Sequence, residues 1–385
     1  MTMTKMIPAE AFPMTDFLKE EMEARGWSQA DLSQIVGKSP RDIHSLVNGK
    51  VTLKPEMATL LGDAFGTGPE YWMNLETSYR AWLTSRATRE TVSRRGLLYE
   101  LAPVREMLRR RWIRPADDIG VLEKQVTQFF GVPDVESLRD LPLPFAAKMT
   151  ADYKAPTTSH KAWMARARNL AQAVSVNKSF SDAAFNDCLA SLRLLLNDPE
   201  ETRHVPRVLA DHGIRFLVIE HLPQTRLDGG CVWLDQGSPV VALSMRFERL
   251  DWFWFTLIHE LGHVKARDGQ GRDGIVDIAL VGQDATARED KSETEKAADL
   301  FAEDFLVSRA ELENFVDRVR PLYSKERIRL FAKRLDVHPA FVVGQLQHRK
   351  EIEYSHSRDV LRDKLRGAIT ANALTDGWGY EPLTV

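Results

Sequence analysis

The sequence predicts an α+β protein that is mainly helical, with an all-α N-terminal domain and a small β-sheet in its C-terminal half. Three observations support this fold class. The first 80 residues carry short amphipathic segments separated by glycine and proline, and residues 80–200 are rich in arginine with helical patterning. Residues 214–243 then carry three short β-rich runs. A chain of 385 residues accommodates two or three domains of about 100–200 residues each.

Four short helices are expected in the first 80 residues. The first spans Phe17 to Arg25, and the fourth spans about Pro55 to Phe65. Between them, Ser28 is placed to cap a helix from Gln29 to Val36, because its hydroxyl oxygen can accept first-turn amides. Ser39-Pro40 opens the next helix, where proline is tolerated at the first position. Two short helices joined by a tight turn containing glycine form the helix-turn-helix pattern.

The charge of this segment limits how it can bind DNA. Its first 80 residues hold 8 basic and 11 acidic side chains, and the whole chain has a net charge of −3. Nucleic-acid binding draws much of its affinity from neutralised phosphates. Any DNA affinity must therefore come from a local basic face, helped by dimerisation.

The rest of the chain divides into a helical region and a mixed region. Residues 80–200 carry no catalytic constellation and are expected to form a connector or regulatory region. The β-rich runs that follow are Ile214–Ile219, Cys231–Leu234 and Pro239–Leu243. They offer either an edge strand for pairing an extended peptide or a fully paired structural sheet. Two long helices are then expected, Arg249–Ala266 and Lys291–Val307, joined by a loop rich in glycine and aspartate.

These patterns define the expected domains. We place a helix-turn-helix domain at 1–82, a helical connector at 83–200, a mixed α+β domain at 201–354 and a C-terminal tail, expected to be loosely ordered, at 355–385.

The composition indicates the cellular compartment in which the protein is expected. No apolar run reaches the roughly 20 residues that a membrane span needs, and the first ten residues lack the pattern of a secretory signal. Only Cys188 and Cys231 occur, without CxxC spacing, which argues against a thiolate zinc site or a disulfide framework. We therefore expect a cytoplasmic protein with no membrane partner.

The strongest chemical motif is His259-Glu260-Leu261-Gly262-His263, which follows the apolar run Trp252 to Ile258. Residues four apart share one face of a helix, so both imidazoles can bind one ion. Glu260 projects to the side, where it can take a proton from the attacking water. Zn²⁺ suits this chemistry because coordination lowers the pKa of water towards about 7. The motif therefore predicts a zinc site with Glu260 as the catalytic base.

A catalytic zinc needs a third protein ligand and one open position. Downstream, Glu295 and Asp299 are again four apart on one helical face. One can bind the metal while the other accepts the remaining N–H of a ligating imidazole. We expect Glu295 to be the ligand and Asp299 the orienting residue, with Glu293 as the alternative ligand. The competing interpretation is an ordinary buried histidine pair beside a solvated glutamate.

At this point the C-terminal half resembles the ImmA/IrrE family of metallopeptidases, in which HExxH precedes a Glu-x-x-Ala-(Asn/Asp)-x-Phe-Ala helix. The segments that carry the resemblance are Leu257-Ile-His-Glu-Leu-Gly-His263 and Glu295-Lys-Ala-Ala-Asp-Leu-Phe-Ala-Glu-Asp-Phe-Leu306. The resemblance covers roughly residues 205–350 and implies a zincin-like α+β metallopeptidase domain with a small β-sheet. It implies that His259, His263 and Glu295 bind zinc and that Glu260 is the base. Many members have a further glutamate where this chain has Ala297.

The N-terminal part resembles the HigA-type antitoxins of the Xre helix-turn-helix class. The matching segments are Phe17-Leu-Lys-Glu-Glu21, Gly26-Trp-Ser-Gln-Ala-Asp-Leu32, Leu46-Val-Asn-Gly-Lys50 and Gly66-Thr-Gly-Pro-Glu-Tyr-Trp-Met-Asn-Leu75. This resemblance implies a homodimer that binds operator DNA and a toxin partner. The implied recognition helix runs from Ser39 to Val47, and the residues expected to reach DNA are Lys38, Ser39, Arg41 and Ser45. Asp42 departs from an ideal basic face.

Together these features predict a DNA-binding regulator with zinc-dependent endopeptidase activity. The ImmA/IrrE resemblance implies a protein substrate that is a helix-turn-helix repressor or a toxin-antitoxin component. The alternative is a HigA-like antitoxin and transcriptional repressor whose metal domain senses or stabilises without catalysis. A third interpretation is a zinc hydrolase that acts on a small molecule, for which a closed, narrow pocket would be expected.

Overall fold

The computed structural model describes residues 11–141, 157–270, 275–278, 280, 291–355, 358–361 and 365–377. The chain divides into two compact units, Met1–Leu97 and Leu98–Val385. Helix α5 (Pro69–Leu101) begins in the first unit and ends in the second. Within the described residues, no helix is both long enough and apolar enough to cross a bilayer.

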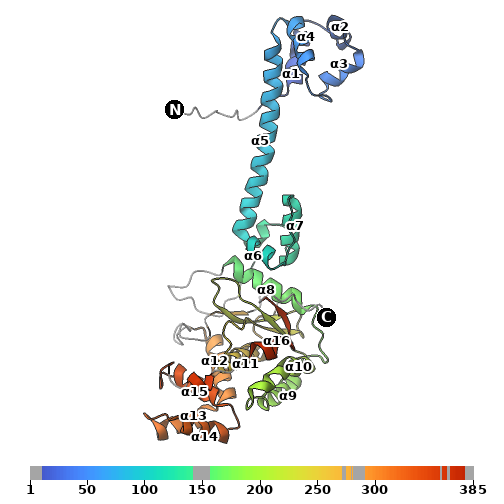
Figure 1. The fold of residues 1–385 in the computed structure, drawn as a ribbon. Helices are drawn as coiled ribbons and strands as arrows, with labels where there is room; N and C mark the ends of the chain where they lie inside the picture. Colours follow the sequence, from blue (N-terminus) through green and yellow to red (C-terminus); the bar gives the residue numbers. More distant parts are fainter. Residues whose placement is uncertain are drawn as a thin grey trace. The chain divides into compact units, whose positions relative to one another are not determined.

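The first unit is all-α, as the sequence predicts. Its helices before α5 are α1 (Met14–Ala24), α2 (Gln29–Ile35), α3 (Pro40–Val47) and α4 (Pro55–Phe65) (Figure 1). They enclose a small apolar core that includes Leu18, Leu32, Ile43, Leu61 and Trp72, each fully buried. The four expected helices are therefore all present.

Local side-chain chemistry sets the start of α2 and of α3. The Ser28 hydroxyl accepts the Asp31 amide at 3.2 Å, and the Asp31 carboxylate accepts the Ser28 amide at 2.7 Å. This reciprocal pair is a capping box. Ser39 caps α3 by accepting the Asp42 amide at 3.2 Å, and Pro40 takes the first helical position. Two short capped helices in contact thus form the helix-turn-helix.

The second unit contains a five-stranded mixed sheet and helices on both sides of it. Its helices before the sheet are α6 (Val104–Arg109), α7 (Ile119–Phe130), the 3-10 turn Glu136–Leu138, α8 (Thr158–Ala171), α9 (Asp182–Arg193), the 3-10 turn Pro199–His204 and α10 (Val205–Asp211). The strands are β1 (Arg215–Ile219), β2 (Leu227–Trp233), β3 (Pro239–Leu243), β4 (Ile275–Ile278) and β5 (Leu374–Asp376). The later helices are α11 (Leu250–Ala266), α12 (Glu293–Leu306), α13 (Arg309–Val319), α14 (Lys325–Arg334), α15 (Pro339–His348), the 3-10 turn Arg358–Leu361 and α16 (Arg366–Thr370).

The sheet has the strand order β4-β2-β3-β1-β5. Strand β1 is parallel to β3 and β5, whereas β2 is antiparallel to β3 and β4. The three strands expected from the sequence are therefore paired on both sides, and the fully paired alternative holds for them. The edges of the sheet are β4 and β5.

Both edge strands lie where no strand was expected. Strand β4 lies in the loop expected between the two long helices, and β5 lies in the tail expected to be loosely ordered, so both expectations are wrong for these residues. The reason is length. Strands of four and three residues are too short to show the alternation by which a half-buried strand is recognised. Pairing with β2 and β1, not local sequence, stabilises them.

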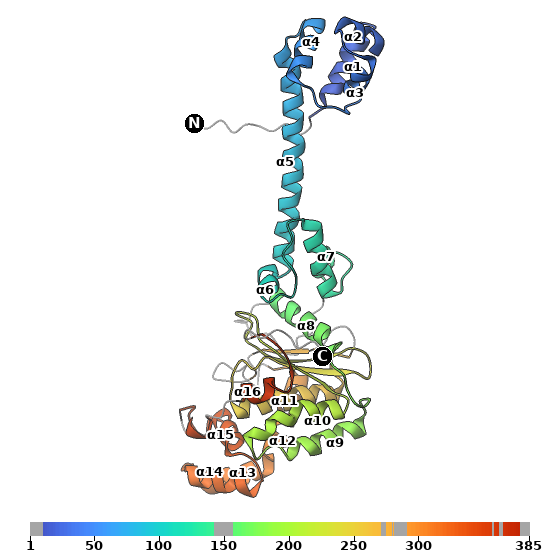
Figure 2. The ribbon, with the colours of Figure 1, turned by 45° about the vertical axis from the view of Figure 1, so that its right-hand side comes forward.

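Helix α8 lies on one face of the sheet and α11 on the other (Figure 2). Two adjacent glycines of β2 show why both layers come close. A Cβ on Gly230 would lie 3.2 Å from the Trp163 ring of α8, whereas a Cβ on Gly229 would lie 2.3 Å from Glu260 Oε1 of α11. The Trp163 indole N–H also donates to the Ile219 carbonyl at 3.1 Å. Helix α8, which falls in the expected connector, therefore packs on the sheet.

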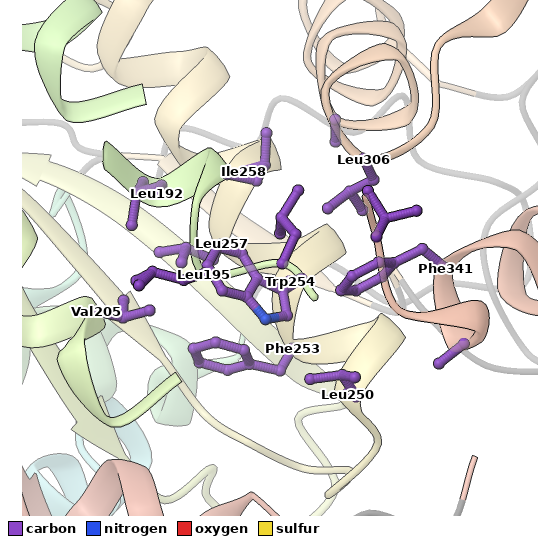
Figure 3. Close-up of a cluster of buried hydrophobic side chains, with 14 of the residues drawn as sticks. Leu192, Leu195, Val205, Leu250, Phe253, Trp254, Leu257, Ile258, Leu306 and Phe341 are labelled. Carbon is purple, nitrogen blue, oxygen red and sulfur yellow. The ribbon is translucent and has the colours of Figure 1, made fainter. Parts of the chain in front are cut away.

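Helix α11 is the central element of the larger core. Its apolar residues Trp254, Leu257 and Ile258 are fully buried. Figure 3 shows them among side chains contributed by α9, α10, α12 and α15. A helix that is apolar on most sides is one that is buried. The HExxH segment thus lies on a helix that the core holds on several sides.

Candidate metal centre

The two histidines of α11 meet as the helical spacing predicts. The Nε2 atoms of His259 and His263 lie 3.1 Å apart, and both side chains are fully buried. Neither imidazole can therefore be solvated by bulk water. Their polar atoms need partners inside the protein.

Helix α12 supplies the first carboxylate. Glu295 Oε2 lies 3.2 Å from His259 Nε2, and Glu295 Oε1 lies 3.2 Å from His263 Nε2. The close approach of the two helices depends on Gly262, since a Cβ there would lie 3.2 Å from the Cα of Ala298. The small residues of both motifs thus allow α12 to bring Glu295 to the histidines.

Strand β4 supplies a second carboxylate, which the sequence analysis missed. Asp277 Oδ2 lies 3.5 Å from His259 Nε2 and 3.7 Å from His263 Nε2, and the residue is 2% exposed. The only signal for it in the sequence was the loop's general richness in aspartate. Its position depends on the pairing of β4 with β2, which sets Asp277 opposite Gly229.

The geometry of these four side chains fits a metal ion. Within the described residues, the ligand atoms of His259, His263, Asp277 and Glu295 all lie within 4.8 Å of one another. A tetrahedral zinc with ligands about 2.0–2.1 Å away would separate them by about 3.3 Å. Carboxylate oxygens of Asp277 and Glu295 are buried without a hydrogen-bond partner. Imidazole and carboxylate donors suit zinc, so the residues fit the cofactor that the motif predicts.

Two further carboxylates face the outer nitrogens of the imidazoles. Asp299 Oδ1 lies 3.0 Å from His259 Nδ1, where the sequence analysis expects an orienting residue. Lys291 Nζ lies 2.8 Å from the other Asp299 oxygen. Asp268 Oδ2 lies 3.0 Å from His263 Nδ1, a partner that the sequence analysis did not single out. Such partners fix which imidazole nitrogen faces the metal.

Glu260 lies beside the cluster and is fully buried, and neither of its carboxylate oxygens has a hydrogen-bond partner. Burial, reinforced by the neighbouring Asp277 carboxylate, raises the pKa of Glu260 well above its ordinary value. A metal cation would oppose both effects because it favours the charged carboxylate. The protonation of Glu260 therefore depends on whether a cation is bound, and Gly229 leaves the space that its side chain occupies.

The pKa values of His263 and Glu295 are shifted in opposite directions. Burial acts to lower the pKa of His263, but the carboxylates of Asp268 and Glu295 raise it to about 9. Burial acts to raise the pKa of Glu295, but the adjacent imidazoles of His259 and His263 hold it far below its ordinary value. Without a cation, charged imidazoles compensate the buried carboxylates.

The other expected site residues lie elsewhere. Glu293, the alternative ligand, is exposed at the start of α12 and pairs with Lys296 at 2.9 Å, so it lies outside the cluster. Lys38 and Arg41 are exposed beside and on α3, and Ser45 is half-buried. The hydroxyl of Ser39 both caps α3 and donates to Asp42 Oδ2 at 2.7 Å. The carboxylate of Asp42, the one acidic residue of α3, is therefore engaged in a hydrogen bond with Ser39.

Comparison with known families places a helix-turn-helix domain at residues 18–72 and an IrrE N-terminal-like domain, a peptidase family, at residues 210–343. The chain therefore joins a DNA-binding regulator domain to a metallopeptidase-like domain. The buried cluster lies within the second match, with Glu260 beside it.

Individual relatives match short segments. An uncharacterized HTH-type transcriptional regulator of Haemophilus influenzae is 34% identical over 68 residues, or 17% of this chain and 64% of the relative. The HTH-type regulator YddM of Escherichia coli is 28% identical over 17% of this chain and 68% of its own length. A solved candidate antidote protein of a plasmid maintenance system from Nostoc punctiforme is 22% identical, with a TM-score of 0.21, over 22% of this chain and 93% of that one. The chain thus spans about two thirds of the regulators it matches.

Removal of a ligand is expected to abolish stoichiometric metal binding. His259→Ala and Glu295→Ala should each lower zinc affinity by more than the about 10–100-fold that loss of an outer hydrogen-bonding partner costs. Elemental analysis and competition with a chelator measure this. Glu293→Gln is the matched control, because it removes a nearby carboxylate that lies outside the cluster. Equal zinc content in wild type and Glu295→Ala would contradict the assignment.

The metal-free protein is expected to lose stability as pH rises from about 6.5 to 9. Because the pKa of His263 is raised to about 9 from an ordinary value of 6.5, the folded state binds more protons than the unfolded state in that window. This contribution is fully present below pH 6.5 and lost towards pH 9. Thermal unfolding after chelation measures it. Added zinc should reverse the trend, since ligating imidazoles are neutral. A flat profile for the metal-free protein would contradict the raised pKa.

Proposed function

We propose that this protein is a DNA-binding regulator whose C-terminal unit is a zinc-dependent endopeptidase. The observation that carries the proposal is the buried Glu260 carboxylate, which has no partner and lies beside the His259, His263 and Glu295 ligand atoms. An ordinary buried histidine pair with a solvated glutamate would leave Glu260 in water. Here Glu260 is fully buried.

In this proposal His259, His263 and Glu295 hold zinc, which supplies Lewis-acid polarisation of the scissile carbonyl and lowers the pKa of water. Glu260 accepts a proton from the attacking water on its carboxylate and then delivers that proton to the leaving amine nitrogen. Asp299 and Asp268 keep the Nε2 atoms of the two imidazoles turned towards the centre of the cluster. Burial excludes bulk water from the proton transfer.

The proposed substrate is a protein with a regulatory role, such as a helix-turn-helix repressor or a toxin-antitoxin component. The fusion to a DNA-binding domain supports this, because it would bring the peptidase to proteins bound near the same operator. The edge strand β4 carries Asp277 into the cluster, so an extended peptide that pairs with the free edge of β4 would lie beside the strand that contributes to the cluster.

The second candidate is an antitoxin-like repressor whose metal domain senses or stabilises without catalysis. One observation favours it: Asp277 provides a fourth side chain at the cluster. Structural zinc sites have four protein ligands, whereas catalytic sites have three and an open position. The resemblance of the first 75 residues to HigA-type antitoxins supports a toxin partner and a homodimer in either case.

Glu260→Gln separates the two candidates. The substitution should keep zinc and DNA binding while lowering peptide hydrolysis by about 10²–10⁴-fold, because general-base catalysis is lost. Incubating a host lysate with the zinc-loaded protein, followed by mass spectrometry of labelled N-termini, detects cleavage of any protein in the lysate. We expect a small set of new N-termini with wild type only.

His259→Ala serves as a metal-free control in the same experiment. The same new N-termini with wild type and Glu260→Gln would exclude Glu260 as the base. No new N-termini with any of the proteins would contradict the endopeptidase proposal and favour the non-catalytic repressor or a hydrolase of small molecules.

For the N-terminal unit we propose that α3 enters the DNA major groove, with Lys38, Ser39, Arg41 and Ser45 at the interface. Its apolar residues Ile43, Leu46 and Val47 are buried, so the opposite face of α3 is the one left for a ligand. Arg41 is exposed on that helix, whereas the capping role of Ser39 leaves only its remaining hydrogen-bonding capacity for DNA. Lys38 and Arg41 form the local basic face that the acidic unit requires.

Arg41→Ala is expected to weaken operator binding and to reduce the salt dependence of binding by about one counterion. Duplexes selected from a random pool provide the operator, and titrations at several salt concentrations provide the slope. Arg89→Ala is the matched control, because it removes an exposed guanidinium from α5. An unchanged affinity and slope for Arg41→Ala would remove α3 from the DNA interface.

A further inference from the structure

Asp277 is the cluster residue that the peptidase chemistry does not use. It is 2% exposed, and its Oδ2 atom has no hydrogen-bond partner although it lies 3.5 Å from His259 Nε2 and 3.7 Å from His263 Nε2. A buried carboxylate is costly unless a charged imidazole, a proton or a metal cation compensates it. Its position therefore requires an explanation beyond sheet packing.

The sheet register places Asp277 there. Asp277 pairs with Gly229 across the β2–β4 ladder, and both residues face α11. Gly229 has no side chain, so nothing from β2 stands between Asp277 and Glu260. A bulge at Asp228 lies in the same ladder, and the Asp228 carboxylate accepts the Leu280 amide at 2.7 Å. The β2–β4 pairing and this hydrogen bond together set the position of Asp277 in the resting structure.

The distances place Asp277 beside the three proposed ligands. The two Nε2 atoms lie 3.1 Å apart, each has one Glu295 oxygen at 3.2 Å, Asp277 Oδ2 lies 3.5 and 3.7 Å from them, and the four ligand atoms all lie within 4.8 Å of one another. The five individual distances lie close to the about 3.3 Å expected around tetrahedral zinc. A working peptidase would keep this fourth position for water.

We propose that Asp277 is a fourth metal ligand that closes the coordination sphere, so that the resting peptidase is latent. This inference rests on the proposed function, because it assumes a metal at His259, His263 and Glu295. It adds that the site accepts substrate only when Asp277 withdraws.

Strand β4 is suited to such a withdrawal. It has four residues and lies at the edge of the sheet, where β2 is its only strand partner within the described residues. Edge strands are held by one ladder instead of two. Imidazole also suits zinc better than carboxylate does, so Asp277 is more easily displaced than either histidine. Asp277 therefore lies on the strand whose movement would disrupt the core least.

The test measures access to the metal in the full-length protein loaded with Co²⁺, whose visible absorption reports coordination number. Acetohydroxamate, a small bidentate metal ligand, is the probe. The wild-type spectrum should stay unchanged in excess probe. Asp277→Asn keeps the size of the side chain and replaces the anionic ligand, so its spectrum should change to a five-coordinate form on titration. Its affinity for Co²⁺ should fall by at least about tenfold.

Asp268→Asn is the matched control. It makes the same carboxylate-to-amide change at a residue that contacts His263 Nδ1 but not the cluster centre. The substitution should also weaken Co²⁺ binding, but the spectrum of the variant should stay unchanged when acetohydroxamate is added. Circular dichroism checks that each variant is folded.

A wild-type protein that binds acetohydroxamate as readily as Asp277→Asn would overturn the inference, and this arm needs no variant to fold. A folded Asp277→Asn that stays closed would overturn it as well. A wild-type protein that binds no metal at all is a different result, because it would remove the zinc-dependent function on which the inference rests.

Discussion

The second unit depends on compensating a group of buried charges. Glu260, Asp277 and Glu295 are each at most 2% exposed, and they converge on two imidazoles that are fully buried. Isolated charges are not stable in a protein interior, so they must be neutralised by protons or by a bound cation. The pKa values of His263 and Glu260 are raised, so protons neutralise part of this charge in the metal-free protein. A bound metal cation would neutralise it in place of those protons. Folding therefore depends on compensating these charges, and the proposed metal binding and catalysis would depend on the same groups.

The surrounding backbone is arranged to make that convergence possible. Gly262 lets α12 approach α11, and Gly229 lets β2 pass over Glu260. The apolar side of α11, with Trp254 and Leu257, is packed into the core and holds the helix in place. Thus the small residues bring the charged groups together, while the large apolar residues prevent the two helices from separating in response to the charge.

The two units have different proposed functions, DNA binding in the first and peptide hydrolysis in the second. Arg41 on the short capped helix α3 and Lys38 just before it are exposed, as the proposed DNA interface requires, whereas the mixed α+β unit buries the groups of its cluster. If the second unit is a peptidase as proposed, its activity would have to be restrained until the substrate is present. The position of Asp277 on an edge strand would link these properties in our proposal, because the same strand lies beside the buried cluster and would supply its fourth ligand.

The sequence by itself determined the features that depend on neighbours along the chain. Helix spacing was sufficient to place His259 beside His263 and to align Glu295 with Asp299, and capping residues were sufficient to place α2 and α3. Tertiary structure alone decided the position of Asp277, the strands β4 and β5, and the packing of α8 on the sheet. The reason is that these features arise from pairing between distant segments. A strand of three or four residues shows too little alternation to be predicted from sequence, and its pairing register is set by the partner strand.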